Sequence, residues 1–404
     1  MAAPASAPVA ARPATAGLVP LFAVSGGLTV GNLYLALPLL DTLARDFDAS
    51  HLAVSLIVVV TQAAYALGLV LVVPLADMLD RRRLILTLLT VESAALLLAG
   101  AAPVLQVLYL AGLLIGLACV VVMVMVPFAA SLAEESARGR VIAGVMSGVL
   151  IGSLLMRFLS GVLGEHLGWR PVYFGSAALA ALTALTLRQR LPAGLGARPP
   201  GRLGYGELLR SLPGLLRAHP VLRRRSLYGM LCFGSFTAFW TPLPFLLADP
   251  PYEYGAGAVG LLSLVGIGGV VAAVLAGRLA DRAPADGSRP GRGPTGLLLA
   301  GVCLSFLPAW GGAHSLVFLI LGTFLLDFMV QGAHITNQGA IYRLPPEIRG
   351  RVTSVYMTAY FIGGAAGGAA SAAVYSAAGW GGSCLLGAGL AGAALLAWGA
   401  ERRR

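Results

Sequence analysis

The sequence has 404 residues, of which 58% are hydrophobic and only 11% are charged, whereas a soluble domain carries about 25% charged residues. This composition excludes a water-soluble globular fold and predicts a helical membrane protein, because the hydrophobic runs are about 17–25 residues long, enough to cross a hydrocarbon core about 30 Å thick. The formal net charge is +11 and every basic residue is arginine, so no lysine is present for a P-loop or a Schiff base, and we expect energy to come from an ion gradient or a separate subunit.

Twelve hydrophobic stretches predict twelve membrane-spanning helices. The Ala- and Pro-rich residues 1–17 precede them, lack the layout of a signal peptide and predict a disordered tail. The predicted spans are 18–40, 52–76, 84–101, 104–128, 141–164, 171–188, 226–248, 258–280, 295–311, 315–342, 352–376 and 382–400.

A linker rich in Pro, Gly and Arg divides these spans into two groups of six. The linker covers residues 189–225 and contains an amphipathic stretch near Tyr205–Leu216. We therefore expect one six-helix unit over 18–188, a second over 226–400, and a short tail at 401–404.

The arginines predict how the chain crosses the membrane. An even number of spans puts both termini on one side, and that side holds 25 of the 28 arginines. Only Arg45 and Arg170 fall on the other side, and Arg157 falls within a span. Because arginine accumulates on the cytoplasmic side, both termini are predicted to be cytoplasmic. The membrane topology explains the basic charge, with contact to anionic lipids as a second role. Nucleic-acid binding is therefore not needed to explain it.

The two groups of spans carry matching short motifs. The pairs are Arg138–Val141 and Arg349–Val352, Gly168–Trp169 and Gly379–Trp380, and Leu75–Asp77 and Leu279–Asp281. The first two pairs keep the same spacing of 211 residues. Such a duplication predicts two similar six-helix bundles, with any substrate site between them near the middle of the bilayer.

The loop after the second span resembles a known signature. Leu75–Arg83 and its counterpart Gly277–Arg282 are similar to the loop motif of the major facilitator superfamily, and the resemblance extends over nearly the whole chain. It is closest to the bacterial twelve-helix efflux branch, the drug/proton antiporter type. Gly144, Gly148 and Gly152 in the fifth span keep the glycine spacing of antiporters and favour close helix packing.

The resemblance implies a fold, a location and a conformational latch. It implies two pseudo-symmetric bundles that alternate access to a small-molecule substrate across a bacterial inner membrane, as a monomer and without a cofactor or metal. It also implies that the loop acids and arginines change ion-pair partners as the bundles rock. The latch residues would be Asp77, Arg81, Arg82, Asp281 and Arg282. The alternative is that these charges only set the topology.

Three charged residues lie inside predicted spans, where a charge costs on the order of 3 kcal/mol on insertion scales. They are Glu92, Arg157 and Asp327. For Glu92 we favour a structural partner. Arg157 either neutralises a buried acid such as Asp327 or binds an anionic group of the substrate.

The tenth span carries a polar stripe. Asp327, Gln331, His334 and Gln338 follow the spacing i, i+4, i+7 and i+11 and share one helix face, with Asn337 on its shoulder. Helix 10 borders the central cavity in the family that the chain resembles. Asp327 and His334 are candidates to bind a proton and the substrate. The alternative is an interhelical hydrogen-bond network that only holds the helix.

Further candidates lie in the first and seventh spans. Asn32 and Tyr34 are polar, and Trp240 belongs to an aromatic group near Pro242 and Pro244, which should break the helix. An ordinary bundle core explains this aromatic group almost equally well.

One glycine-rich motif is misleading. Gly255–Gly260 satisfies G-x-G-x-x-G, but it follows a predicted loop and not a strand, so we do not expect a dinucleotide site.

These observations favour a secondary-active transporter over an enzyme, since no nucleophile–base pair or metal-ligand cluster is evident. The leading hypothesis is export of a small organic or drug-like molecule in exchange for protons. One alternative is proton-coupled or facilitated uptake of a sugar or organic acid. An alternative of another class is a membrane sensor or scaffold that does not transport.

Overall fold

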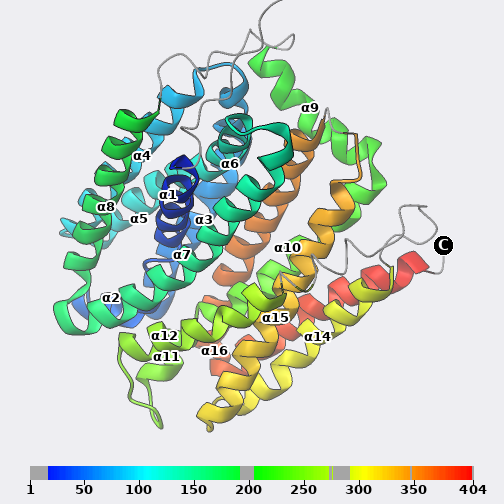
Figure 1. The fold of residues 1–404 in the computed structure, drawn as a ribbon. Coiled ribbons are helices and arrows are strands. Elements are labelled where there is room, and N and C mark those ends of the chain that lie inside the picture. The colour runs from blue at the N-terminus through cyan, green and yellow to red at the C-terminus, as the bar shows by residue number, and fades with distance from the viewer. Residues whose placement is uncertain (1–16, 192–203, 273–274, 276–291, 346–347, 403–404) are drawn as a thin grey trace, which may run out of the picture.

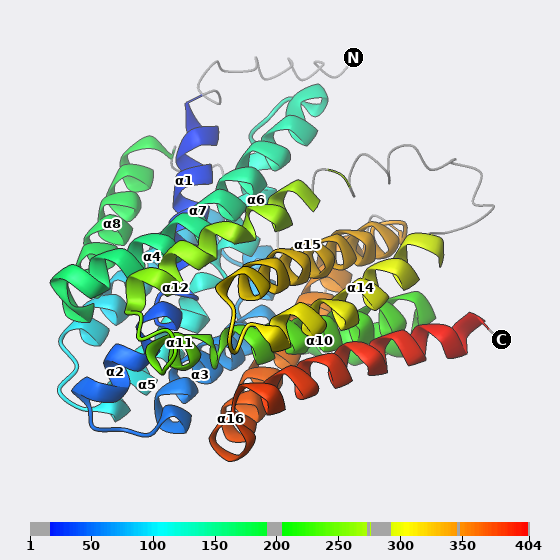
Figure 2. The ribbon, with the colours of Figure 1, turned by 90° about the horizontal axis from the view of Figure 1, so that it is seen from below.

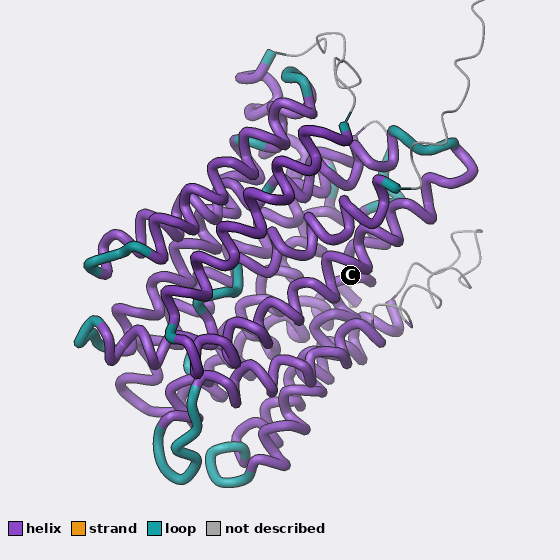
Figure 3. The backbone as a smooth tube through the Cα atoms, turned by 60° about the vertical axis from the view of Figure 1, so that its left-hand side comes forward, coloured by secondary structure: helices purple, strands orange, loops and turns teal. Residues whose placement is uncertain are grey.

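The computed structural model describes residues 17–191, 204–272, 275, 292–345 and 348–402. Over these ranges the chain is helical, without strands, and nine helical stretches are long and apolar enough to cross a membrane. Figure 3 shows long helices joined by short loops. The predicted all-α membrane fold is therefore confirmed, while the predicted N-terminal tail lies outside the described residues except for Gly17.

The first half of the chain forms one bundle. Its elements are α1 (Leu18–Asn32), η2 (Leu37–Leu39), α2 (Leu40–Asp46), α3 (His51–Leu71), η3 (Val73–Asp77), α4 (Arg81–Gly100), α5 (Leu105–Cys119), α6 (Val121–Ser131), η4 (Glu135–Ala137), α7 (Arg138–Leu167) and α8 (Trp169–Arg190). Within the bundle α1 packs along α7, α3 along α5, and α4 along α8.

The second half forms the other bundle. Its elements are α10 (Pro220–Trp240), α11 (Leu243–Ala248), α12 (Ala256–Ser263), η5 (Leu264–Gly266), α14 (Arg292–Gly311), α15 (Leu316–Ile341) and α16 (Arg349–Arg402). Here α10 packs along α16 and α14 along α15. In Figure 1 the first bundle occupies the upper left and the second the lower right.

The two bundles meet along two seams. One joins α3 to α16, and the other joins α7 to α12. Figure 2 shows α12 lying beside α7, although these helices are far apart in the sequence. The space between the two seams is therefore walled by both halves of the chain.

The amphipathic stretch predicted in the linker is confirmed as helix α9 (Tyr205–Ala218). The Tyr205 hydroxyl donates to the carbonyl of Leu71 at 2.6 Å, and Arg351 donates to the Ser211 hydroxyl at 3.3 Å. Because Leu71 belongs to the first bundle and Arg351 to the second, α9 connects both halves beyond the covalent linker.

Two predicted spans differ from the structure in their boundaries. The first, predicted over 18–40, corresponds to a candidate span over Leu18–Asp46, within which α1 ends at Asn32 and a turn separates it from η2, where Pro38 supplies no backbone donor. The seventh begins earlier than predicted, at Pro220. Its expected break at Pro242 and Pro244 is confirmed, since α10 ends at Trp240 and α11 starts at Leu243.

The last two predicted spans both belong to α16, in which two helices meet at one non-helical residue. Gly379 has φ 62° and ψ −160°, a conformation that strains any residue with a Cβ atom. The chain changes direction there, between the predicted ends at 376 and 382. Glu401, assigned by the sequence to the C-terminal tail, is still helical and accepts hydrogen bonds from Arg224 and Tyr228.

The glycine spacing of the fifth span does bring helices close together. A Cβ atom on Gly148 would lie 2.7 Å from the Ala23 carbonyl oxygen, and one on Gly152 would lie 2.4 Å from the Cα of Gly27. The backbones of α1 and α7 therefore touch at positions where only glycine fits.

Candidate functional site

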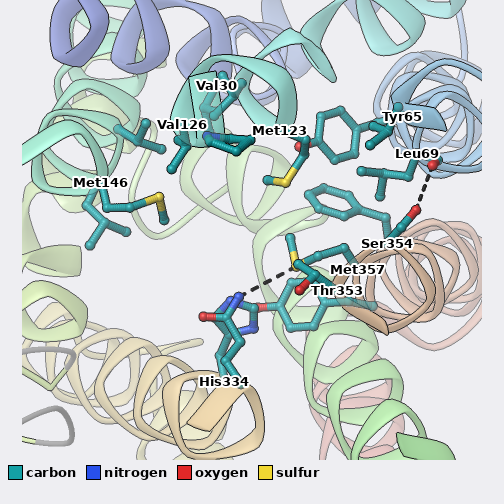
Figure 4. Close-up of a pocket in the computed structure, with 18 of the residues that line it drawn as sticks. Val30, Tyr65, Leu69, Met123, Val126, Met146, His334, Thr353, Ser354 and Met357 are labelled. Carbon is teal, nitrogen blue, oxygen red and sulfur yellow. Dashed lines mark hydrogen bonds between the residues drawn. The ribbon is translucent and has the colours of Figure 1, made fainter. Parts of the chain in front are cut away.

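A large cavity lies between the two bundles. Its volume is about 1620 Å³, and its wall includes residues of α1, α3, α6 and α7 from the first half and of α10, η5, α15 and α16 from the second. Most of the wall is apolar. Figure 4 shows Met123, Met146 and Met357 around this space, with His334 at its edge.

The cavity opens toward the arginine-rich face, which we define by the loops that carry Arg81–Arg83, Arg138–Arg140 and Arg349–Arg351. The lining residues at this end include Asp77, Arg81, Arg349 and Arg351. Leu208 and Leu212 of α9 also contribute to the wall, so the linker helix forms part of the mouth.

The opposite end is closed by contacts between the halves. A Cβ atom on Gly161 of α7 would lie 2.7 Å from the Cα of Gly260 of α12, so these two helices pack backbone to backbone. The Gly257 amide donates to the Glu165 carboxylate at 2.6 Å. The glycine-rich motif is thus a helix-packing surface.

A ring contact closes the second seam at this end. The His51 ring stacks on Phe245 with ring centres 4.0 Å apart. These two residues belong to α3 and α11, one from each half. The structure therefore shows a conformation open on one side of the membrane only.

Arg157 lies deep in the cavity. Its guanidinium carbon lies 5.1 Å from the centre of the Tyr34 ring and 5.2 Å from that of Trp240, so rings from both halves enclose it. The side chain is 6% exposed, and Nε and Nη1 have no hydrogen-bond partner among the described residues. Such a buried donor left unpaired costs about 1–3 kcal/mol.

Asp327 faces the same region from α15. It is 6% exposed and accepts a hydrogen bond from the indole nitrogen of Trp240 at 3.2 Å. The carboxylate is close enough to Arg157 for the two charges to interact. Gly266 leaves room for it, since a Cβ atom there would lie 2.6 Å from Oδ2. An acid from the second half therefore faces a guanidinium from the first.

The polar stripe of the tenth span follows the cavity wall. Gln331, His334 and Gln338 line the cavity together with Asp327. The Tyr356 hydroxyl lies 3.0 Å from Nδ1 of His334, and the Tyr360 ring lies 4.6 Å from the His334 ring between centres. His334 is therefore held by aromatic residues of α16.

Asn337, on the shoulder of that stripe, lies elsewhere. It is buried inside the second bundle, and its side-chain oxygen accepts a hydrogen bond from Arg225 at 3.2 Å. It is not among the residues that line the cavity.

Asn32 and Glu92 also lie away from the cavity, inside the first bundle. Glu92 is fully buried and accepts hydrogen bonds from Asn32 at 2.8 Å, from the Thr29 hydroxyl at 3.0 Å and from the Cys119 thiol at 3.6 Å. Sequence reasoning missed Thr29 and Cys119, because a threonine or cysteine in an apolar helix gives no signal of its partner.

The loop charges of the first half form local contacts. Arg81 lies 3.7 Å from Asp77, and Arg82 donates to the carbonyl of Arg188 at the end of α8 at 2.7 Å. The corresponding second-half residues, Asp281 and Arg282, lie outside the described residues.

Several lining residues gave no signal in the sequence. Met123 and Met146 line the cavity but resemble core residues in sequence. Ser354 donates to the carbonyl of Leu69 at 2.7 Å and so ties α16 to α3 at the cavity edge, as Figure 4 shows. No group of three His, Cys, Asp or Glu side chains suited to a metal ion occurs in the part of the chain that the structure describes.

Comparison with known sequences decides the family. A sequence model described as "Major Facilitator Superfamily" matches residues 22–292. The chain belongs to the major facilitator superfamily. Two relatives support this membership over almost the whole chain. The "Uncharacterized transporter YgaY" of Escherichia coli O157:H7 is 42% identical over 94% of each chain. The "Probable transporter SCO4007" of Streptomyces coelicolor is 34% identical over 91% of this chain and 83% of its own.

Solved structures agree on the superfamily fold. The crystal structure of the nucleoside transporter NupG superimposes with a TM-score of 0.75 at 14% sequence identity, covering 97% of this chain and 100% of its own. This likeness concerns the fold alone. Together with its relatives, it makes the chain a multi-pass membrane protein and a transporter of the major facilitator type.

Proposed function

We propose that this transporter is a proton-coupled exporter of small amphipathic organic molecules. The observation that carries the proposal is that Arg157 and Asp327, one from each bundle, both line a cavity of about 1620 Å³ and lie close enough for their charges to interact. A titratable acid between two bundles that move against each other couples proton binding to their rearrangement.

The orientation of the cavity supports loading from inside the cell. Because arginine-rich loops stay in the cytoplasm, the open face is the cytoplasmic one, and the chain lies in the bacterial inner membrane with both termini inside. A cavity open to the cytoplasm and closed on the other side is the state in which an exporter takes up its cargo.

The chemistry of the wall supports an amphipathic cargo. Apolar and aromatic side chains cover most of the cavity, and the charged and polar groups collect around Arg157, Asp327 and His334. A molecule with an apolar body and one polar group matches this division. The transporter acts as a monomer in this proposal, because both walls of the cavity come from one chain.

The loop after α3 supplies the latch of this proposal. Asp77 and Arg81 lie at the mouth of the cavity, where the bundles must approach each other for the cytoplasmic side to close. Arg82 and the second-half pair Asp281 and Arg282 complete the latch in the proposed cycle.

Everted membrane vesicles that contain the full chain test the proposal. Vesicles with a preset pH gradient receive small amphipathic acids, amines and neutral amides. At least one class should enter the lumen and change the gradient. The Asp327→Asn variant should lose the gradient response, while Asp46→Asn, an exposed acid of the opposite face, should keep it. An unchanged response in Asp327→Asn, or no response to any class in the unmodified protein, contradicts the proposal.

A further inference from the structure

The surroundings of Arg157 specify a substrate class. We infer that the transporter binds an organic anion, an aryl or alkyl carboxylate, with its charged group on Arg157 and its apolar body on the aromatic wall, and that this anion and a proton on Asp327 are bound together. The inference rests on the proposed function and adds the charge of the cargo and the sign of the coupling.

Arg157 has unused hydrogen-bonding capacity. Its Nε and Nη1 have no hydrogen-bond partner among the described residues, although the side chain is more than nine-tenths buried, and Arg157 lines the cavity. A guanidinium presents its donors in a planar fork that matches the two oxygens of a carboxylate. A buried arginine with unpaired donors at the end of a cavity is therefore a binding group for a carboxylate.

Aromatic rings from both halves contact the guanidinium of Arg157. Its faces lie against Tyr34 of the first half and Trp240 of the second, at 5.1 and 5.2 Å. The same Trp240 donates to Asp327 at 3.2 Å. Trp240 thus contacts both charged groups, with its ring at Arg157 and its indole nitrogen at Asp327.

Asp327 and a bound anion compete for the positive charge of Arg157. When Asp327 is ionised, its negative charge balances Arg157 and repels a second anion. When Asp327 is protonated, the charge of Arg157 is unbalanced and attracts the anion. The other titratable groups that line the cavity near Asp327 are His334 on its own helix, Tyr34 after the end of α1 and Tyr360 of α16. None of them is an acid that would replace the balancing charge.

A group of aromatic residues in the cavity wall forms a surface for the apolar body of the ligand. Beside the charged end, Phe233 stacks on Tyr360 with ring centres 4.0 Å apart, and it lies 5.6 Å from Phe236 and 5.2 Å from Phe361. All four residues line the cavity. Such a surface binds a phenyl or alkyl group and gives a sugar few hydrogen-bond partners.

The sign of the coupling follows from linkage. Because protonation of Asp327 increases the affinity for the anion, the bound anion increases the affinity for the proton by the same factor. The proton and the anion then leave the cell together, driven by the gradient of the organic acid, and not in exchange.

Three ligands with one body and different charges test the inference. They are 3-phenylpropionate, 3-phenylpropanamide and 3-phenylpropylamine, and their binding to the purified full chain is measured by calorimetry. We expect the carboxylate to bind at least about tenfold more tightly than the other two, and more tightly as the pH is lowered. Arg157→Gln should remove this preference and Arg157→Lys should retain part of it, while Arg170→Gln, at an exposed arginine of the opposite face, should change nothing.

The Asp327→Asn variant gives a second readout. It should bind the carboxylate independently of pH and at least as tightly as the unmodified protein does at low pH. Tighter binding of the amine, equal binding of all three ligands, or an intact preference in a folded Arg157→Gln protein overturns the inference. Absence of carboxylate binding up to about 10 mM overturns it as well. Binding with this pattern but without flux in proteoliposomes would refute the proposed function and leave the anion site in place.

Discussion

The two buried carboxylates among the described residues, Glu92 and Asp327, differ in their surroundings. Glu92 lies inside the first bundle, where three donors of that bundle bind it and no cationic side chain does so among the described residues. Asp327 lies at the cavity between the bundles, with one indole donor and the charge of Arg157 opposite. A buried acid in a membrane helix can therefore have either of two roles. Only the acid that faces the other half can couple its protonation to the relative movement of the two halves.

The largest expected difference between these two acids is in the pH dependence of transport. Asp327→Asn should abolish the pH dependence of transport, because the amide cannot bind and release a proton in the working range. Glu92→Gln should retain it, because this acid lies away from the cavity. Both variants keep the shape of the side chain, and flux into everted vesicles is measured at several external pH values. A pH dependence lost in both variants, or lost only in Glu92→Gln, would reverse the assignment.

The next largest difference is in how much each acid contributes to the free energy of unfolding. Glu92→Ala should lower the free energy of unfolding by about 2–4 kcal/mol, because it leaves the donors of Asn32 and Thr29 buried and unpaired. Asp327→Ala removes the partner of only one donor, at a site that borders the cavity, and should cost less, about 1 kcal/mol. Thermal unfolding of the detergent-solubilised variants gives the order. Equal losses would show that Asp327 is as structural as Glu92.

Part of this contrast was predictable from the sequence. The spacing of Asp327, Gln331, His334 and Gln338 predicted a shared face, because helix periodicity is a local property, and these four residues do line the cavity. Asn32 and Asn337 were candidates on the same grounds of polarity. Their partners, Glu92 and Arg225, come from other helices, and such pairings depend on how the helices pack.

The fold, too, could be predicted from the sequence only in part. Hydrophobic length and the linker predicted twelve spans in two groups, because the thickness of the bilayer imposes that length. The end of α1 at Asn32 was not predictable, because the residues that follow are as apolar as the helix itself. Nor could the sequence show which end of the cavity is open, since one sequence must form both conformations of an alternating-access cycle.

A smaller effect comes from Trp240, which donates to Asp327 through its indole nitrogen and contacts Arg157 with its ring. Trp240→Phe keeps an aromatic ring beside the guanidinium but removes the indole donor. We expect the midpoint of the pH dependence of transport to shift to higher pH by about one unit, because the ionised carboxylate loses a hydrogen bond that stabilises it. Thermal stability should fall as well, because Trp240 is fully buried and the smaller ring leaves a cavity. A midpoint that does not move would mean that this hydrogen bond is equally strong in both protonation states of Asp327.

The smallest effect concerns a single donor to Glu92. Thr29→Val removes the hydroxyl that donates at 3.0 Å and keeps the branched shape of the side chain, so it changes one hydrogen bond without leaving a cavity. The expected loss is about 1 kcal/mol of unfolding free energy with unchanged flux and unchanged pH dependence. Thr183→Val is a matched control, since that buried hydroxyl donates only to the carbonyl one turn before it in α8 and should cost less. If Thr29→Val altered the pH dependence of transport, Glu92 would have to exchange protons during the cycle. The two acids would then form one pathway across both bundles, and the contrast between them would be one of position along that pathway.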